Sequence, residues 1–445
     1  MMKAFILAGA TSGVGKTTIT CALMSYFTNN GKKVRPFKVG PDYIDPKFHQ
    51  IATSVSSYNL DSYLISEENI KYLFQKHSKN KDIAVIEGVM GLFDGYGKDL
   101  TGSTANIAKI LDLPVILIVN AKGISQSLAA MILGYATFDP DLKISGVILN
   151  NVSSGEHYNF LKDYIEEKTG TCCIGYFPKL NEEFFGSRHL GLIPIEEIKD
   201  IKEKIDFLGS CISKTINFDI LDKIIKEINP PINQKSLDIT NCKLKIGVAK
   251  DEAFSFYYKD NLDLMEEFGI ELVYFSPIND KSLPKGIDGL YFGGGFPEVF
   301  ANELSVNKSL LLEIKNCCEN NMPVYAECGG LIYLTEGIID KDNNFYNTVG
   351  FFNIKTKMTD KLQRFGYIEV DYENIKIKAH EFHHSTLEES NDKNYEFSYK
   401  ISKLDKNKQW VCGLKRKNVL AGYPHIHFYS NFEFFKKIIN LWESK

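Results

Sequence analysis

The stretch from Gly9 to Thr18 constrains the fold of this chain more than any other. It reads Gly-Ala-Thr-Ser-Gly-Val-Gly-Lys-Thr-Thr and lies between an apolar run, Ala4 to Ala8, and a helical pattern from Thr17 to Phe27. A glycine-rich turn between a buried strand and a helix directs backbone N–H groups at one point, where the helix N-terminus adds positive potential. The sequence therefore predicts a phosphate-binding loop at the start of an α/β domain.

The loop departs from the usual phosphate-binding spacing at one position. That spacing places a glycine at position 10, which is Ala10 here, and the glycine stands one residue earlier at Gly9. The lysine and first threonine that end the loop suit the outer phosphates and the accompanying Mg²⁺. A tight turn without a ligand is the alternative reading. The predicted nucleotide contacts of the loop are Gly9, Gly13, Val14, Gly15, Lys16, Thr17 and Thr18.

Carboxylates follow the next two predicted strands. The second strand ends in Gly-Pro-Asp-Tyr-Ile-Asp-Pro, which carries Asp42 and Asp45, and the third, Ile83 to Ile86, is followed by Glu87 and then Asp94. Ligands of α/β folds lie at the carboxyl ends of strands. Glu87 suits a Mg²⁺ ligand or a group that orients water. The three aspartates have a simpler reading as turn carboxylates.

Apolar strands and helical patterns alternate along the chain. This alternation predicts α/β architecture built on mostly parallel, doubly wound sheets. A polar stretch with two prolines, Asn229 to Ser236, reads as a linker, and a fresh α/β series begins at Lys245. The predicted organisation is a first domain over residues 1–228, a linker over 229–243 and a second doubly wound domain over 244–445.

The second domain contains a candidate nucleophile. Cys328 follows the apolar run Pro323 to Glu327 and precedes two glycines, which allows a sharp strand-to-helix turn. A position at a helix N-terminus predicts a lowered pKa for this thiol. His425, just past the strand Val419 to Tyr423, is a candidate base. Backbone N–H groups of Gly293 to Gly295 are candidates for an oxyanion hole.

Each of these residues also has a less specific reading. A cysteine after a strand is most often a small buried apolar residue. His425 and His427 are a candidate metal pair, because alternate residues of a strand share a face, but no third ligand is evident. The cluster of His380, His383 and His384 lacks the spacing of a helical zinc site. For that cluster we expect a substrate-binding or structural role.

Composition argues against several other classes of protein. The formal net charge of −4 argues against broad binding to nucleic acid or anionic membranes. No apolar run approaches the ~20 residues that span a bilayer. The chain enters its first strand directly, so no signal peptide is expected. The nine scattered cysteines fit the reducing cytoplasm.

Together these motifs resemble a known family. The N-terminal half is similar to phosphate-loop enzymes of the dethiobiotin-synthetase type, and the C-terminal half to class I glutamine amidotransferase domains of the cobalamin pathway. The whole chain resembles the cobyrinic acid a,c-diamide synthases, over essentially its full length. The motifs that carry the resemblance are residues 39–46, Glu87 to Gly95, Arg188 to Leu192, Gly294 to Glu298 and His380 to His383.

The resemblance implies a carbon–nitrogen ligase that amidates the a- and c-carboxylates of a corrinoid, using two ATP and two L-glutamine. It implies an ATP-binding amidoligase over 1–228 and a glutamine amidotransferase over 244–445. It also implies Cys328 as nucleophile, His425 as its activating histidine and Asn150 as a contact to adenine. The broader class has a glutamate two residues past the histidine, where this chain has His427. That departure leaves a Cys–His pair, with His427 as a candidate helper.

The chemistry of amide formation assigns the remaining roles. A carboxylate must be activated before it can accept ammonia, and ATP does this by forming an acyl phosphate. Lys16 and a Mg²⁺ held by Thr17, Asp42 and Glu87 are expected to spread the developing charge. Asp94 is expected to position substrate or nucleotide. Because ammonia is largely protonated in neutral water, a shielded path from Cys328 to the acyl phosphate is expected.

Two other functions remain open on the sequence alone. The same chemistry can act on hydrogenobyrinic acid or a nickel sirohydrochlorin. A partition-type nucleotide-switch ATPase has a similar loop but no use for Cys328 and His425. The expected partners are a corrinoid, L-glutamine and ATP, without nucleic acid or membrane, and a homodimer is left open.

Overall fold

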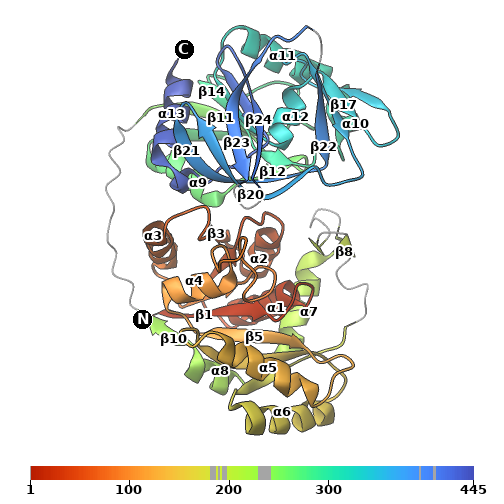
Figure 1. The fold of residues 1–445 in the computed structure, drawn as a ribbon. Helices are drawn as coiled ribbons and strands as arrows, with labels where there is room; N and C mark the ends of the chain where they lie inside the picture. The colour runs from red at the N-terminus through yellow and green to blue at the C-terminus, as the bar shows by residue number, and fades with distance from the viewer. Residues whose placement is uncertain are drawn as a thin grey trace. The chain divides into compact units, whose positions relative to one another are not determined.

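The computed structural model of the chain describes residues 2–180, 187–188, 191–192, 198–228, 242–389, 392–403 and 407–444. The chain divides into two compact units, Met1–Lys235 and Ser236–Lys445, coloured red to green and green to blue in Figure 1. Residues 229–241 of the predicted linker, and residues 189–190 of the motif from Arg188 to Leu192, lie outside the described residues. Among the described helices, none is both long and apolar enough to cross a bilayer.

The first unit contains a parallel sheet in the order β3-β2-β4-β1-β5-β6-β7. The strands are β1 (Met2–Gly9), β2 (Val34–Val39), β3 (Tyr58–Leu60), β4 (Ile83–Glu87), β5 (Val115–Asn120), β6 (Ile144–Val152) and β7 (Cys173–Pro178). A short strand, β10 (Lys226–Ile228), pairs antiparallel with the start of β1. The central strands are mostly apolar because helices cover both faces of such a sheet. This arrangement confirms the predicted parallel α/β fold of this half.

Helices connect the strands of the first unit (Figure 1). They are α1 (Lys16–Asn29), α2 (Asp45–Thr53), α3 (Glu67–Ser78), α4 (Thr104–Leu111), α5 (Ser127–Phe138), α6 (Gly155–Thr169), α7 (Ile201–Ile212) and α8 (Phe218–Ile224). Serines accept N-terminal hydrogen bonds at the starts of α3, α4 and α6. Phe5 and Leu7 of β1 share one core with Ile19 and Leu23 of α1. The core thereby fixes the loop between β1 and α1.

The second unit contains a mixed sheet in the order β13-β11-β14-β16-β25-β24-β23-β20-β21. Its strands are β11 (Lys245–Ala249), β13 (Glu271–Phe275), β14 (Gly289–Phe292), β16 (Val324–Glu327), β20 (Arg364–Tyr372), β21 (Ile375–His383), β23 (Glu396–Lys403), β24 (Lys408–Arg416) and β25 (Val419–Gly422). The strands from β13 to β25 run parallel, and the sheet continues antiparallel from β24 to β21. The α/β class is confirmed, and the antiparallel extension was not predicted.

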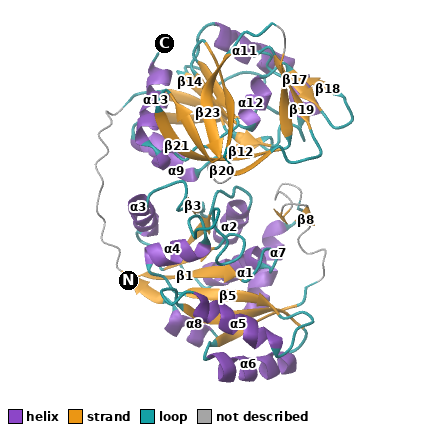
Figure 2. Ribbon diagram, viewed as in Figure 1, coloured by secondary structure: helices purple, strands orange, loops and turns teal. Residues whose placement is uncertain are grey.

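Smaller sheets and helices complete this unit (Figure 2). One smaller sheet pairs β12 (Phe254–Phe256) with β15 (Gly294–Gly295). The other has four strands in the order β18 (Phe345–Asn347), β17 (Gly337–Ile339), β19 (Ile354–Met358) and β22 (Ser385–Glu389). The helices are α9 (Lys259–Glu267), α10 (Ala301–Val306), α11 (Lys308–Glu319), α12 (Gly329–Leu334) and α13 (Phe432–Glu443). Trp442 of α13 is fully buried and donates a hydrogen bond to the Leu290 carbonyl of β14.

Candidate functional site

The predicted phosphate loop connects β1 to α1. Gly13 and Gly15 have φ angles of 73° and 92°, a left-handed region that glycine adopts without steric cost. A Cβ atom on Gly9 would lie 2.7 Å from Val14 Cγ1 and 2.9 Å from the Thr11 oxygen. The displaced glycine is therefore required by the close approach of the loop to its own start, which accounts for the departure from the usual spacing.

Asn150 holds this loop from the end of β6. Its Nδ2 donates a hydrogen bond of 2.8 Å to the Val14 carbonyl. A Cβ atom on Gly15 would clash with the same amide nitrogen. The carboxamide predicted to contact adenine thus contacts the loop itself in this structure, and its role toward a nucleotide stays a prediction.

Lys16 and Thr17 direct their side chains toward β4 and the segment that follows it. Lys16 Nζ donates to the Met90 carbonyl at 2.6 Å, and Thr17 Oγ1 donates to Glu87 Oε1 at 2.7 Å. Burial, together with the nearby Lys38, lowers the pKa of Lys16 to about 8. The fold thus brings together three residues that the sequence placed at one site: the lysine and threonine of the loop and the glutamate that ends β4.

A buried ionic network surrounds Glu87. Lys38 Nζ lies 2.9 Å from Glu87 Oε1 and 2.5 Å from Asp45 Oδ2, and His49 Nε2 lies 2.6 Å from Glu87 Oε2. Burial alone would raise the pKa of Glu87, but Lys38 and His49 outweigh it and hold the pKa well below its usual range. Lys38 and His49 were not predicted from the sequence. The available signal was a lysine between two apolar residues of β2.

Asp42 and Asp94 both have local roles in turns. Asp42 Oδ1 accepts hydrogen bonds from the N–H groups of Ile44 and Asp45, at 2.8 and 3.0 Å. Asp94 Oδ2 accepts one from the N–H of Gly91 at 2.8 Å. The turn reading therefore applies to both, and their predicted roles toward metal and substrate stay predictions.

In the second unit, Cys328 lies on a strained turn between β16 and α12. Its φ and ψ are 47° and −101°, which is costly for a residue with a side chain. Its N–H donates to the Gly422 carbonyl of β25 at 2.7 Å, and its Sγ lies 3.9 Å from the Phe382 carbonyl of β21. The hydrogen bond to Gly422 fixes the turn on the end of the neighbouring strand. Such a turn is the predicted elbow that presents a nucleophile.

The predicted low pKa of Cys328 is wrong for this structure. Burial raises the pKa of the thiol, and the nearby carboxyl groups of Glu298 and Glu381 raise it further. The helix that follows, α12, is only six residues long, so its N-terminus does not offset the loss of hydration. The thiol is therefore neutral at rest, and it needs a base to become a nucleophile.

His425 lies just past β25, in the state that a base requires. Burial, with His380 close by, lowers the pKa of His425 to about 3, so the imidazole is neutral. The backbones of His425 and His380 form two hydrogen bonds, with nitrogen–oxygen distances of 2.8 and 3.2 Å. A Cβ atom on Gly294 would clash with the His425 ring, and one on Gly329 would lie 3.0 Å from the Gly295 nitrogen. The turn at 294–295 thus borders both the imidazole and the residue after Cys328.

One part of the predicted oxyanion hole is already engaged. The N–H of Gly293 donates a hydrogen bond of 2.8 Å to the Tyr257 hydroxyl. Gly294 and Gly295 form β15 and pair with Phe256 and Phe254 of β12. Gly293 is therefore corrected from a candidate donor to a structural residue, because Tyr257 uses the same N–H group.

His427 and His383, two other histidines of this unit, have different surroundings. His427 is turned to different partners, since its Nδ1 accepts from the Tyr429 N–H at 3.3 Å and its Nε2 lies 3.5 Å from Asp260 Oδ2. The ring of His383 stacks on that of Tyr423, with centroids 3.7 Å apart. His383 belongs to β21, the strand whose Phe382 carbonyl lies near the Cys328 thiol. In the described parts of the chain, no group of three or more His, Cys, Asp or Glu side chains is arranged to hold a metal.

Glu327, directly before Cys328, is a buried carboxyl group held by hydrogen bonds. Its Oε1 accepts from the Tyr325 hydroxyl at 2.7 Å and from the Ile426 N–H at 3.2 Å, and its Oε2 lies 3.3 Å from the Tyr291 hydroxyl. Burial raises the pKa of Glu327 from its ordinary 4.5 to about 7. A group whose pKa is raised in the folded state stabilises the fold at low pH and loses that contribution as the pH rises through 7.

We therefore expect Glu327→Gln to become stabilising relative to the wild type as the pH rises. The amide resembles the protonated acid, so the difference in free energy of unfolding should favour the variant by about 2–3 kcal/mol more at pH 8 than at pH 5. Both tryptophans of the chain, Trp410 and Trp442, lie in the second unit, so urea unfolding followed by their fluorescence measures this unit. The exposed Glu303, changed to Gln, is the control. An unchanged difference at the two pH values would contradict the raised pKa.

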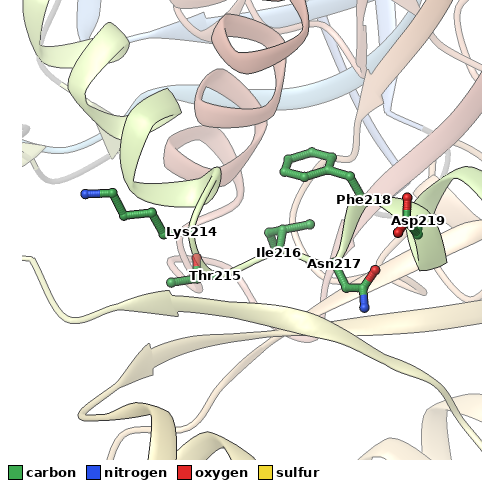
Figure 3. Close-up of a pocket in the computed structure, with 6 residues that line it drawn as sticks. All are labelled: Lys214, Thr215, Ile216, Asn217, Phe218 and Asp219. Carbon is green, nitrogen blue, oxygen red and sulfur yellow. The ribbon is translucent and has the colours of Figure 1, made fainter.

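Two surface depressions of the described residues are lined by residues other than the phosphate loop, Cys328 and His425. One of about 450 Å³ is lined by residues 214–219 between α7 and α8 (Figure 3). Its Asn217 caps α8 and its Phe218 stacks on Tyr26, so both side chains serve local structure. A second depression, of about 250 Å³ in the second unit, is lined by Glu298, Asp340, Lys341, Asp342 and Met358. Of these, only Glu298 belongs to a motif of the sequence analysis.

Comparisons with known proteins agree with the two units. Residues 5–192 match the CobQ/CobB/MinD/ParA nucleotide-binding domain family, and residues 245–432 match the CobB/CobQ-like glutamine amidotransferase domain family. A cobyrinate a,c-diamide synthase of Caldanaerobacter subterraneus subsp. tengcongensis is 44% identical over 99% of this chain and 98% of its own length. Proteins of the same name from Clostridium tetani and Fusobacterium nucleatum are 46% and 43% identical, over 98% of this chain and 100% of each relative.

The fold and the two sites therefore define a phosphate-loop nucleotide-binding domain joined in one chain to a glutamine amidotransferase domain. Identity above 40% over nearly the whole length of several relatives narrows this class to one family. The chain belongs to the cobyrinate a,c-diamide synthase family.

Proposed function

We propose that this chain catalyses the ATP- and glutamine-dependent amidation of the a- and c-carboxylates of cobyrinic acid. The observation that carries the proposal is the presence of both halves of this chemistry in one chain. A phosphate loop lies against the buried Glu87 in the first unit. In the second unit, the glycine turn at 294–295 lies against the neutral His425 and against the residue that follows the strained Cys328.

The first unit activates the acceptor. An oxygen of the substrate carboxylate attacks the γ-phosphorus of ATP, the bond to the bridging oxygen breaks, and ADP leaves. Ammonia then attacks the carbonyl carbon of the acyl phosphate, loses a proton, and expels inorganic phosphate. Lys16 contributes positive charge where the transferring phosphoryl group develops negative charge. Asp94, exposed beside the loop, is proposed to position the substrate.

The residues at this site fit a Mg²⁺ ion, which prefers oxygen ligands. The Thr17 hydroxyl and the Glu87 carboxylate lie 2.7 Å apart, and Asp42 follows the neighbouring strand. These three residues would hold the ion. When bound, Mg²⁺ supplies positive charge between the substrate carboxylate and the triphosphate, whose negative charges repel one another.

The second unit supplies ammonia. His425 accepts the proton of Cys328, and the sulfur attacks the side-chain amide carbon of glutamine. The proton returns to the leaving nitrogen, ammonia departs, and water hydrolyses the thioester to release glutamate. The neutral thiol and neutral imidazole are the starting states that this proton transfer needs.

The test of this function is a glutamine-dependent ATPase and amidation assay with candidate tetrapyrroles. We expect cobyrinic acid to give two ADP and two glutamate for each diamide formed. Hydrogenobyrinic acid and nickel sirohydrochlorin are the comparison substrates. Preference for either of them, measured as kcat/KM, would contradict the assignment of cobyrinic acid, and ATP turnover without any tetrapyrrole effect would favour a nucleotide switch.

Asp42→Asn is expected to damage the amidation step far more than ATP binding. The variant keeps the Oδ1 acceptor that holds the N–H groups of Ile44 and Asp45, so the turn is preserved while the charge is lost. Diamide formation, ATP affinity and glutaminase rate are measured in the same variant. Asp340, whose Oδ1 also accepts two backbone N–H groups, gives the control Asp340→Asn in the other unit. Intact amidation with collapsed ATP affinity would show that Asp42 has another role.

We propose the cytoplasm as the site of action, because all nine cysteines are free thiols and a reducing compartment keeps them so. The absence of nucleic-acid binding stays a prediction from net charge. The homodimer also stays a prediction.

A further inference from the structure

Three aromatic side chains form an exposed patch in the first unit. The ring of Phe93 stacks on Tyr135 of α5, with centroids 5.8 Å apart, and its centroid lies 4.7 Å from that of Phe138. Phe93 and Tyr135 are half-buried, and Phe138 is 70% exposed. We call Phe93, Tyr135 and Phe138 the aromatic patch.

Two hydrogen bonds connect the aromatic patch and the residue next to it to the phosphate loop. The Tyr135 hydroxyl donates a hydrogen bond to the Ala10 carbonyl. The N–H of Leu92, next to Phe93, donates to the Gly9 carbonyl at 2.9 Å. A ligand resting on these rings would therefore lie beside the nucleotide site rather than on a remote surface.

The helix that carries most of the patch is unusual for a surface helix. The sequence of α5, Ser-Leu-Ala-Ala-Met-Ile-Leu-Gly-Tyr-Ala-Thr-Phe, has no charged residue. Leu128, Ala129 and Ile132 are buried, whereas Leu133 and Phe138 are exposed. Exposed faces of surface helices are ordinarily polar or charged, and contiguous exposed apolar groups mark binding sites. The apolar outer face of α5 is thus not explained by the core of the unit.

We propose that the aromatic patch binds one face of the tetrapyrrole macrocycle and so presents its peripheral carboxylates to the phosphate loop. This inference rests on the function proposed above. A broad macrocycle with apolar faces matches exposed rings, which gain free energy from burial and from stacking. Asp94, the residue after Phe93, lies at the edge of the patch, on the turn closed by the Gly91 N–H.

The need to amidate two carboxylates favours this kind of contact. One phosphate loop must act on both the a- and the c-carboxylate, so the macrocycle has to be held in two orientations. Directional hydrogen bonds to its periphery would fix one orientation. Apolar contact with a ring face depends on area rather than direction, and it tolerates both.

The experiment compares Phe138→Ala with the wild-type full-length chain. Phe138 is largely exposed, so its removal leaves the core intact. We expect the KM for cobyrinic acid, and its Kd from equilibrium dialysis without ATP, to rise about tenfold, which corresponds to about 1.4 kcal/mol. The KM for ATP and the glutaminase rate should stay unchanged. Phe138→Trp should restore tight binding. The control is Phe207→Ala, which removes a 51% exposed ring from α7.

An unchanged Kd for cobyrinic acid in Phe138→Ala would overturn the inference. If the same variant instead converts a dimer to a monomer in sedimentation, with cobyrinic acid binding unaltered, the patch is an interface between copies of the chain. A wild-type chain that binds cobyrinic acid without amidating it would contradict the proposed function alone. The dialysis comparison then still decides whether the patch binds the macrocycle.

Discussion

Cys328→Ser is expected to abolish glutamine-dependent amidation while amidation with added ammonium salt continues. The loss should reach at least about a thousandfold in kcat, as expected when a nucleophile is removed. Serine fits the strained turn, but its hydroxyl has a far higher pKa than a thiol, and the neutral His425 is too weak a base to activate it. The acceptor is activated in the other unit, which the substitution does not alter.

The measurement follows diamide formation with glutamine and with ammonium salt in parallel. Cys317→Ser, on α11 of the same unit and half-buried, is the matched control and should retain both activities. Equal loss of both activities in a folded Cys328→Ser variant would contradict the separation of the two sites.

Lys16→Ala is expected to remove amidation with either nitrogen source. Lys16 contributes the ammonium nearest to the expected phosphates, and loss of such a charge costs about 10²–10³-fold or more in rate. The hydrogen bond to the Met90 carbonyl is also lost, which loosens the segment that follows β4. Glutaminase activity at Cys328 should survive at least in part, because its residues belong to the other unit.

The readouts are ATP-dependent amidation with ammonium salt and glutaminase rate without ATP. Lys32→Ala removes an exposed lysine beyond the end of α1 and controls for the general change in charge. Amidation near the wild-type rate in Lys16→Ala would exclude the loop as the site of phosphoryl transfer.

The parallel strands could be predicted because burial on both faces leaves a clear record in the sequence. The predicted runs at 4–8 and 83–86 lie within β1 and β4, and those at 323–327 and 419–423 contain β16 and β25. The antiparallel extension has weaker signals. In β20 and β21 charged residues alternate with apolar ones, as in Ile-Lys-Ile-Lys, and this pattern is typical of strands with one solvated face.

The candidate sites were predictable where a motif follows a strand in the sequence. Thr17 and Glu87 are 70 residues apart, yet parallel pairing of β1 and β4 brings them to one edge of the sheet. Lys38 and His49 were missed because their importance lies in contacts with Glu87, which no local pattern reveals. The predicted lowering of the Cys328 pKa was wrong for a similar reason. The pKa is raised by burial and by two carboxyl groups that are distant in sequence.

In the proposed reaction, each carboxylate is activated as an acyl phosphate before ammonia attacks it. The direct test is to supply cobyrinic acid with ¹⁸O-labelled a- and c-carboxylates, together with ATP and glutamine, and to analyse the inorganic phosphate by mass spectrometry. If an acyl phosphate forms, every amide formed transfers one carboxylate oxygen to phosphate, and we expect this result. Unlabelled phosphate, with the label found in AMP or water, would contradict it.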